Sequence, residues 1–198
     1  MTPLLSARGV AVERGDRPLL QNVSLSVFAG QVWQLVGANG MGKTSLLRAL
    51  SGLARLGVTG DIQRHAPLLY LGHSAALKLS LTATENLRFH PACETSAQPG
   101  EIASALAAVN LRGYEGRPVS SLSAGQQRRV ALARLVLSPA ALWLLDEPFT
   151  ALDAAGCDWL EHRVREHVAE QGAVVFTSHQ ASRFGGLQQD MDLSHHVV

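Results

Sequence analysis

The sequence has little cysteine and almost no net charge, and both shortages narrow what the protein can be. Its 198 residues include two cysteines, Cys93 and Cys157, which lie far apart and outside any Cys-x-x-Cys pattern. A disulfide framework or a zinc site is therefore not indicated, and a reducing compartment fits. Lys and Arg number 17 against 16 for Asp and Glu, so the basic excess typical of a nucleic-acid binder is missing. We expect no nucleic-acid partner.

Long apolar runs are also missing. No stretch approaches the roughly 20 apolar residues that cross a bilayer as a helix, and the longest runs, such as residues 140–145, have the size of a strand. The first residues lack the basic start and the apolar run of a signal peptide. If the protein acts at a membrane, another subunit must hold it there.

One glycine-rich stretch is present, and it fits a phosphate-binding pattern. Residues 37–44 read Gly-Ala-Asn-Gly-Met-Gly-Lys-Thr, which matches G-x-x-x-x-G-K-[ST] at every required position. The apolar run at 31–36 predicts a buried strand before the loop, and residues 45–50 predict a helix after it. In that context the loop N–H groups and the helix N-terminus can bind one anion together. A glycine-rich turn that matches by chance is the alternative, and the flanking elements disfavour it.

This loop predicts how a nucleotide would be held. Lys43 can reach the terminal phosphates, and the Thr44 hydroxyl can bind Mg²⁺. The predicted nucleotide contacts are Gly37, Ala38, Asn39, Gly40, Met41, Gly42, Lys43, Thr44 and Ser45.

The rest of the chain predicts an α/β fold in a single domain of residues 1–198. Residues 4–27 alternate and turn often, with breaks at 14–16 and at Pro18, and they predict short antiparallel strands. Residues 74–139 are mostly helical in pattern, and strands and helices alternate again after them. We therefore expect a P-loop NTPase core with a mostly parallel sheet buried on both faces, an antiparallel N-terminal β region and an inserted helical subdomain.

Single elements can be placed within this plan. Thr82 followed by Glu85 forms a capping-box pattern at a helix start, and residues 92–100 predict an exposed loop. The helical segments are 82–89, 101–109, one from Ser123 to Pro139, and 154–170, and the strand-like segments are 68–71, 140–145 and 173–178.

Two carboxylates follow the strand predicted at 140–145. Asp146 and Glu147 would lie at its C-terminal edge, where side chains face the ligand crevice of an α/β sheet. Asp146 would hold Mg²⁺ through water, and Glu147 would orient or deprotonate an attacking water. The alternative is that both residues are ordinary surface acids at the end of a strand. The presence of the phosphate loop disfavours this alternative.

Residues 122–127, Leu-Ser-Ala-Gly-Gln-Gln, supply another helix start. Ser123 is a good N-cap, and Gly125 lets another backbone come close. A plain capped helix would explain both residues. Because the chain already has a phosphate loop, a second anion site suggests that the nucleotide of another subunit docks there.

These motifs together resemble the ATP-binding cassette (ABC) ATPase family, and the resemblance covers nearly the whole chain. The order of residues 122–127 before Asp146-Glu147-Pro148 is its most specific part. Residues 151–153 resemble the D-loop of the family, and His179, after the strand at 173–178, resembles its switch histidine.

The resemblance implies ATP hydrolysis with ATP and Mg²⁺ as cofactors, and with Lys43, Glu147 and His179 as catalytic residues. It also implies that two copies pair head-to-tail and enclose ATP between them. The residues that it places between the copies are Ser123, Gly125 and Gln126 at the γ-phosphate held by the partner, and Asp153 across the interface.

Two positions depart from the family pattern. His73 stands where a glutamine is usual, after the short strand at 68–71. The family position makes His73 a candidate Mg²⁺ ligand. A neutral imidazole can accept a hydrogen bond from water, but its charge changes near neutral pH. Arg14 stands where an aromatic residue usually stacks on adenine. A guanidinium plane can stack on a base too, and a solvated turn charge is the alternative.

One branch of the family is matched more closely, by residues 71–73, 77–87, 122–135 and 146–151. These stretches resemble the ATP-binding subunits of the bacterial haem exporters of c-type cytochrome maturation. The resemblance implies a peripheral subunit on the cytoplasmic face of the inner membrane, bound to integral membrane subunits. Its ATP hydrolysis would drive haem export or the release of haem from a carrier. The chain has no Cys-x-x-Cys-His motif, so we expect no direct haem binding.

Three other interpretations stay open at this point: an ABC exporter of another small substrate, a soluble ABC-type switch on nucleic acid or the ribosome, and a small phosphoryl-transfer kinase. The soluble switches carry two cassettes or coiled-coil insertions, whereas this chain has one phosphate loop and no heptad run. A kinase leaves residues 122–127 and His179 unexplained. Co-purification with membrane subunits, or with ribosomes or DNA, separates these interpretations.

Overall fold

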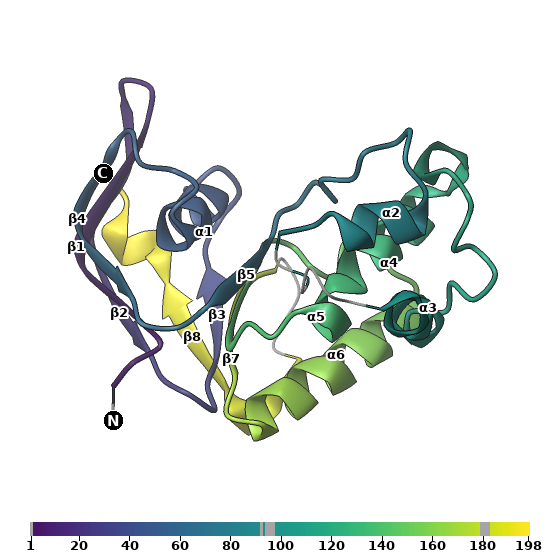
Figure 1. The fold of residues 1–198 in the computed structure, drawn as a ribbon. Coiled ribbons are helices and arrows are strands. Elements are labelled where there is room, and N and C mark those ends of the chain that lie inside the picture. The colour runs from purple at the N-terminus through teal and green to yellow at the C-terminus, as the bar shows by residue number, and fades with distance from the viewer. Residues whose placement is uncertain (1, 92, 94–97, 179–182) are drawn as a thin grey trace. The chain divides into compact units, whose positions relative to one another are not determined.

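The computed structural model describes residues 2–91, 93, 98–178 and 183–198. The described chain forms two compact units, whose elements are labelled in Figure 1. Each unit is assembled from segments that are far apart in the sequence. The first unit comprises Met1–Tyr70, Ala140–Pro148 and Val164–Val198, and the second comprises Leu71–Pro139 and Phe149–Arg163.

An antiparallel sheet forms one layer of the first unit. β1 (Leu5–Arg14), β2 (Arg17–Val27) and β4 (Val58–Arg64) pair in the order β2-β1-β4. The predicted break at Gly15 is the turn between β1 and β2, but Pro18 is not a break, because it pairs with β1 from within β2. Proline is tolerated in β2 because this is an edge strand of its sheet. The sequence patterns do not predict β4, whose residues are mostly polar.

The other sheet has the strand order β5-β6-β7-β3-β8. β3 (Val32–Val36) pairs in parallel with β7 (Ala173–Thr177) and with β8 (Gln188–Asp192), and β7 pairs in parallel with β6 (Leu142–Leu145). β5 (Leu68–Leu71) lies beside β6. Every residue of β6 and β7 is buried, as their continuous apolar runs predict. The patterns do not predict β8, an edge strand with a polar sequence.

A hydrophobic core lies between the two sheets, and α1 (Lys43–Ser51) contributes four side chains to it. Alternate residues of β6 and β7 face this core, following the two-residue period of a strand. The core fixes β3 and α1, and therefore the ends of the loop between them. Its buried residues include Leu5, Val10, Leu20, Val23, Leu35, Leu46, Leu47, Leu50, Leu142, Leu144 and Val175.

The second unit is helical. Its elements are α2 (Ala83–Arg88), α3 (Pro99–Ala108), the 3-10 turn η1 (Val119–Ser121), α4 (Ala124–Leu132), α5 (Arg134–Leu137) and the part of α6 (Ala154–Ala169) before residue 164. The predicted capping box of Thr82 and Glu85 is present at the start of α2. α3 begins at Pro99, inside the segment predicted as a loop, because proline fits the first turn of a helix.

The single helix predicted between Ser123 and Pro139 is instead two helices, α4 and α5. The N–H of Ala133 bonds to the carbonyl of Arg129, four residues back, whereas the N–H of Val136 bonds to the carbonyl of Ala133, three residues back. The hydrogen-bond ladder therefore tightens at Ala133 and divides the helix. α5 ends before Pro139 as predicted, because the residue before a proline is driven into extended backbone.

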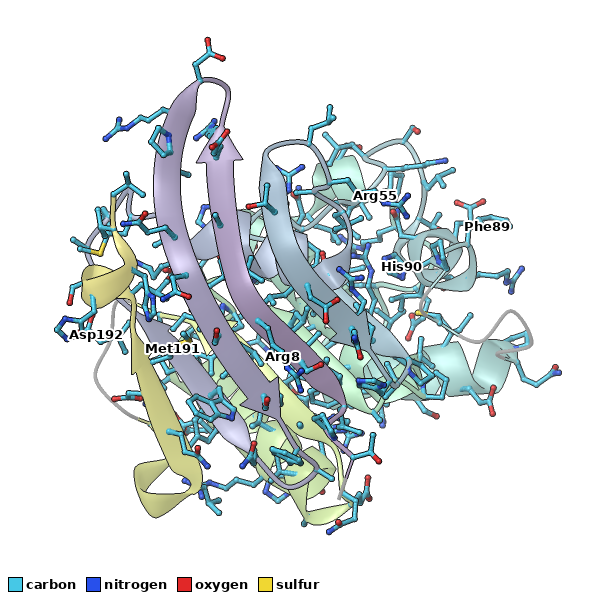
Figure 2. The ribbon with its side chains drawn as sticks, turned by 90° about the vertical axis from the view of Figure 1, so that its left-hand side faces the viewer. Arg8, Arg55, Phe89, His90, Met191 and Asp192 are labelled. Carbon is cyan, nitrogen blue, oxygen red and sulfur yellow. The ribbon has the colours of Figure 1, made fainter. Side chains whose placement is uncertain are left out.

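The C-terminal segment returns to the first unit. The 3-10 turn η2 (Gly185–Leu187) precedes β8, and η3 (Leu193–His196) follows it. Val197 forms an antiparallel bridge with Leu20 of β2, and Figure 2 shows Met191 of β8 beside the antiparallel sheet, against whose core it packs. Within the described ranges, no helix is long and apolar enough to cross a bilayer.

Candidate functional site

The glycine-rich loop between β3 and α1 has a backbone that only glycine adopts easily. Gly42, the residue before α1, has φ 105°, and a Cβ there would lie 3.2 Å from Cβ of Leu19. Gly37 has φ 153°, and a Cβ there would lie 2.7 Å from the sulfur of Met41. A larger residue at either position would be strained by the positive φ and would require a neighbouring side chain to shift. The loop therefore turns tightly after β3 and ends at the N-terminus of α1, the arrangement that favours an anion.

Lys43 is held at this loop by two backbone carbonyls. Its Nζ donates to the carbonyl oxygen of Gly37 at 2.6 Å and to that of Ala38 at 3.1 Å, and the residue is 7% exposed. A buried ammonium group requires such partners. The positive charge is thereby fixed beside the first turn of α1, where the helix dipole also attracts an anion.

Thr44, the next residue, contacts the predicted acidic pair. Its Oγ1 donates a hydrogen bond of 3.0 Å to Oδ1 of Asp146, which joins α1 to the end of β6. Asp146 is 1% exposed. A hydroxyl and a carboxylate oxygen are hard ligands of the kind that Mg²⁺ prefers, so the chemistry of this donor pair fits a magnesium ion.

Thr177, at the end of β7, is a member of the site that the sequence patterns do not predict. Its Oγ1 donates to the same Oδ1 of Asp146 at 2.8 Å and accepts from the N–H of Glu147 at 2.8 Å. The residue is fully buried. One hydroxyl therefore connects the two acidic residues that follow β6.

Glu147 has a left-handed backbone, with φ 50°. For a residue with a Cβ this conformation costs about 1 kcal/mol or more, and it persists only where the surroundings hold it. The bond from its N–H to Thr177 is one such restraint. Strained backbone of this kind gathers at functional sites, and here it carries the carboxylate that the sequence predicts to act on water.

The carboxylate of Asp146 affects the pKa of Tyr70, on β5. Burial and the nearby Asp146 carboxylate raise the pKa of Tyr70 to about 12, against an opposing effect of Arg48. Tyr70 therefore keeps its proton at physiological pH. The negative charge of this strand end comes from the acidic pair, and it favours a bound cation.

The predicted second anion site lies in the second unit, at the start of α4. Ser123 Oγ accepts from the N–H of Gln126 at 3.2 Å, and Gln126 Oε1 accepts from the N–H of Ser123 at 2.9 Å. This reciprocal pair is a capping box and explains both residues locally. A Cβ on Gly125 would lie 3.2 Å from the carbonyl oxygen of Ala151, so the close backbone approach expected at this glycine occurs within the same unit.

Asp153 caps the start of α6. Its Oδ1 accepts from the N–H of Gly156 at 3.0 Å and forms an ion pair with Arg129 of α4. The backbone hydrogen bond from Gly156, followed by the interaction with Arg129, holds the pKa of Asp153 below its usual value. Within one copy, Asp153 thus ties α6 to the helix that begins at Ser123, a contact that the sequence patterns do not predict.

The remaining predicted residues make none of the contacts described above, or fall outside the described residues. Arg14 is the last residue of β1, is exposed, and pairs across the turn with Arg17. His73 follows β5 within the second unit and is exposed. His179 lies outside the described residues.

Residues 20–150 match the ABC transporter family. The match covers most of the chain and includes the phosphate loop and the acidic pair, so the chain belongs to this family. Its fold class, predicted from the sequence, is confirmed by solved ABC ATPases. The protein is an ATP-binding ATPase coupled to transport.

Curated relatives share nearly half of their residues with this chain. The chain is 46% identical to the cytochrome c biogenesis ATP-binding export protein CcmA of Hahella chejuensis over 197 residues, which cover 93% of each chain. It is 45% identical to the CcmA protein of Escherichia coli (strain K12) over 189 residues, 89% of each chain. The predicted resemblance to the cytochrome c branch is thereby confirmed.

Solved structures share the fold. An ATP-binding protein of an ABC transporter from Pyrococcus furiosus superimposes with a TM-score of 0.81 at 24% identity, covering 98% of this chain and 99% of that one. A metal-chelate type ABC transporter in an inward-facing conformation gives a TM-score of 0.72 at 26% identity, covering 90% of this chain and 74% of that one.

Proposed function

We propose that this chain is the ATP-hydrolysing subunit of a transporter that serves c-type cytochrome biogenesis, and that its ATP turnover drives haem export or the release of haem from a carrier. The observation that supports this role most strongly is the 46% identity to a cytochrome c biogenesis export protein along 93% of both chains. A likeness of that length extends over nearly the whole chain.

Within one copy, the loop and Lys43 would hold the phosphates of ATP. The N–H groups at the start of α1 would face the phosphate oxygens, and Lys43 would exchange a loop carbonyl for the β- and γ-phosphates. Thr44 and Asp146 would hold Mg²⁺, which neutralises charge on the β- and γ-phosphate oxygens when bound. These assignments are supported by the hydrogen-bonded Thr44–Asp146 pair and by the buried lysine.

Glu147 would orient the attacking water and accept its proton. The water oxygen forms a bond to the γ-phosphorus while the bond from that phosphorus to the β–γ bridging oxygen breaks, which leaves ADP and inorganic phosphate. The restrained left-handed backbone of Glu147 supports this role.

A second copy would complete each site. Ser123, Gly125 and Gln126 would approach the γ-phosphate bound by the partner, and Asp153 would lie at the interface. Ser123, at the start of α4, is exposed, and this exposure supports the arrangement. His179 would contact the γ-phosphate from the copy that binds it. His73 is proposed as an additional Mg²⁺ ligand, and Arg14 as a stacking partner for adenine.

Integral membrane subunits would anchor the dimer at the cytoplasmic face of the bacterial inner membrane. The chain would act there as one cassette of residues 1–198 with its helical subdomain at about 74–139, and it would not bind haem itself. Among the residues that the structure describes, no group of three or more His, Cys, Asp or Glu side chains is placed to hold a metal ion.

Co-purification tests the proposed partners. The tagged chain, expressed in its host and extracted in detergent, is expected to carry integral membrane proteins needed for c-type cytochrome formation. A membrane complex of another pathway would instead identify the chain as the ATPase of a different small-substrate exporter. Recovery with ribosomes or DNA would make it a soluble ATP-driven switch. Loss of holo-cytochromes c in a strain that lacks the chain is the matching cellular control.

A further inference from the structure

Thr177 lies between the two residues on which the proposed chemistry depends. It is the last residue of β7, it is fully buried, and both of its side-chain hydrogen bonds go to the acidic pair. We propose that Thr177 is a positioning residue for ATP hydrolysis, which orients the Asp146 carboxylate and holds the backbone of Glu147 in place. The inference rests on the roles proposed above for these two residues.

The direction of both hydrogen bonds is fixed by chemistry. A backbone N–H can only donate, so the Thr177 oxygen accepts from Glu147. An ionised carboxylate can only accept, so the single hydroxyl hydrogen of Thr177 goes to Asp146. One bond uses the hydroxyl hydrogen and the other uses a lone pair of the hydroxyl oxygen, so the two bonds are compatible. Together they determine the side-chain rotamer of Thr177.

The sheet places this hydroxyl where it is needed. β6 and β7 pair in parallel, with Leu145 opposite Phe176. Asp146 follows Leu145 directly after β6, and Thr177 follows Phe176 as the last residue of β7, so the register brings the carboxylate and the hydroxyl side by side. A contact built on strand register is rigid, which suits a residue that orients a ligand of a metal ion.

Asp146 Oδ1 accepts from two hydroxyls, and these two would behave differently when ATP binds. Thr44 sits on α1 beside the phosphate loop, and its oxygen would turn from Asp146 to the metal ion. Thr177 sits on the neighbouring strand and would keep its bond to Asp146. The carboxylate would therefore retain one fixed partner through the cycle.

A purely structural role for Thr177 fits the contacts less well. The other residues of β7 are Ala173, Val174, Val175 and Phe176, all apolar and buried. Valine has almost the shape of threonine, and a buried hydroxyl is costly unless it is hydrogen-bonded. Valine would fill nearly the same space, so the filling of space alone does not explain the hydroxyl.

The test compares Thr177→Val, which keeps the shape and removes both bonds, with Thr177→Ser, which keeps the hydroxyl. Each variant is prepared in the full chain and in a Glu147→Gln background that binds ATP without rapid turnover. Thermal unfolding is measured first. Binding of a fluorescent ATP analogue is then measured with EDTA and across a Mg²⁺ titration, and Mn²⁺ binding in the presence of ATP is followed by electron paramagnetic resonance.

Loss of an orienting partner of a metal ligand typically costs about 10- to 100-fold in metal affinity or activity. We expect Thr177→Val to need at least about tenfold more Mg²⁺ or Mn²⁺ for half-saturation and to lose at least about tenfold in kcat. Binding of the analogue in EDTA should stay within about threefold of the parent, because the phosphate loop is untouched. Thr177→Ser should retain most of the metal affinity and most of the turnover.

Three results would overturn the inference. The first is parental metal dependence and kcat in Thr177→Val. The second is an equal loss in Thr177→Val and Thr177→Ser, which would assign the effect to packing. The third is a parallel loss of metal-free nucleotide binding, which would place the damage in the phosphate loop. Failure of the proposed function is distinguishable, because the wild-type chain would then show no Mg²⁺-dependent ATPase activity.

Discussion

Thr44 and Asp146 lie 102 positions apart in the sequence, and the hydroxyl of the first donates a 3.0 Å hydrogen bond to the carboxylate of the second. The bond connects the helix after the phosphate loop with the strand end that carries the acidic pair. Both residues belong to the first unit. These two proposed metal ligands thus meet within a single unit of one copy, so we expect one copy to bind ATP before it meets a partner.

Lys43→Ala should sharply weaken ATP binding. The lysine is the one side-chain cation of the loop motif and is already held at the loop by Gly37 and Ala38. Its removal takes away the side-chain counter-charge that the loop offers to the β- and γ-phosphates. Equilibrium binding of a fluorescent ATP analogue measures the effect, with Lys78→Ala, an exposed lysine of the second unit, as the control. Equal affinity in Lys43→Ala and wild type would exclude this role.

Gly125→Asp should block ATP-driven dimerisation while one copy still binds ATP, because a carboxylate would face the γ-phosphate of the partner. The structure adds a control that the sequence does not suggest. Any Cβ at this position lies 3.2 Å from the carbonyl oxygen of Ala151, so Gly125→Ala isolates the steric part. Light scattering with ATP in a Glu147→Gln background should show dimers for Gly125→Ala and monomers for Gly125→Asp. Dimers of Gly125→Asp at normal ATP concentrations would contradict the head-to-tail arrangement.

The sequence predicts those parts of the fold and site that depend on local signals. The phosphate loop needs glycines and a lysine at fixed spacing, and the strand before the acidic pair is a continuous apolar run. Both are visible without a structure, as is the capping box at Thr82. β4 and β8 are not visible, because edge strands such as Gln188–Asp192 bury few side chains and so carry little apolar alternation.

Contacts between distant segments are the other part that the sequence does not predict. The hydroxyl of Thr177 meets Asp146 and Glu147 from 31 and 30 positions away, through a strand register that no motif encodes. The ion pair of Arg129 with Asp153 likewise depends on how α4 meets α6. Polar residues at strand ends and helix surfaces are common, so their partners become known only with the fold.

Gly172→Ala should destabilise the first unit. The ring of His167 stacks on Trp143 with centroids 3.6 Å apart and planes 4° from parallel, and a Cβ on Gly172 would overlap the His167 ring, with Nε2 as the nearest atom. Overpacking of this kind costs about 1–3 kcal/mol. Denaturant unfolding measures it, with Gly116→Ala as the control, since no atom lies within 4 Å of a Cβ there. If the clash is the cause, the added cost of Gly172→Ala should vanish in a His167→Ala background, and a cost that persists there would refute it.

His90 should make the protein less stable in mild acid. Burial, with the nearby Arg134 acting in the same direction, lowers the pKa of His90 from 6.5 to about 4. Between these values the unfolded chain binds a proton that the folded chain does not. The contribution of the neutral His90 side chain to the free energy of unfolding is therefore fully present above about pH 6.5 and is lost as the pH falls towards about 4.

Because His90 is only half-buried, solvent screening reduces this effect, and we expect about 1–2 kcal/mol rather than the full value of the shift. Urea unfolding of wild type and His90→Gln at pH 7.5 and pH 4.5 measures it. The wild type should lose more stability than the variant on acidification. An equal loss in both proteins would mean that His90 does not contribute.

Glu147→Gln should bind ATP normally and hydrolyse it at least about 100-fold more slowly, because the amide keeps the shape but cannot accept a proton. The exchange alters only the side chain, so the backbone N–H of residue 147 still donates to the hydroxyl of Thr177. The fold should therefore be unchanged. Steady-state phosphate release measures the loss, with Glu161→Gln, on α6, as a matched exchange outside the site. Turnover of Glu147→Gln at the wild-type rate would show that Glu147 is not the base.

The formation of c-type cytochromes in cells tests the whole account most directly. A strain that lacks this chain is supplied with wild type or Glu147→Gln at equal expression, and haem-dependent peroxidase staining of covalently bound haem is measured. We predict that wild type restores holo-cytochromes c and that Glu147→Gln does not, although both proteins bind the same membrane subunits. Holo-cytochromes at the wild-type level with Glu147→Gln, or none with wild type, would contradict the claim that ATP hydrolysis at this site drives the pathway.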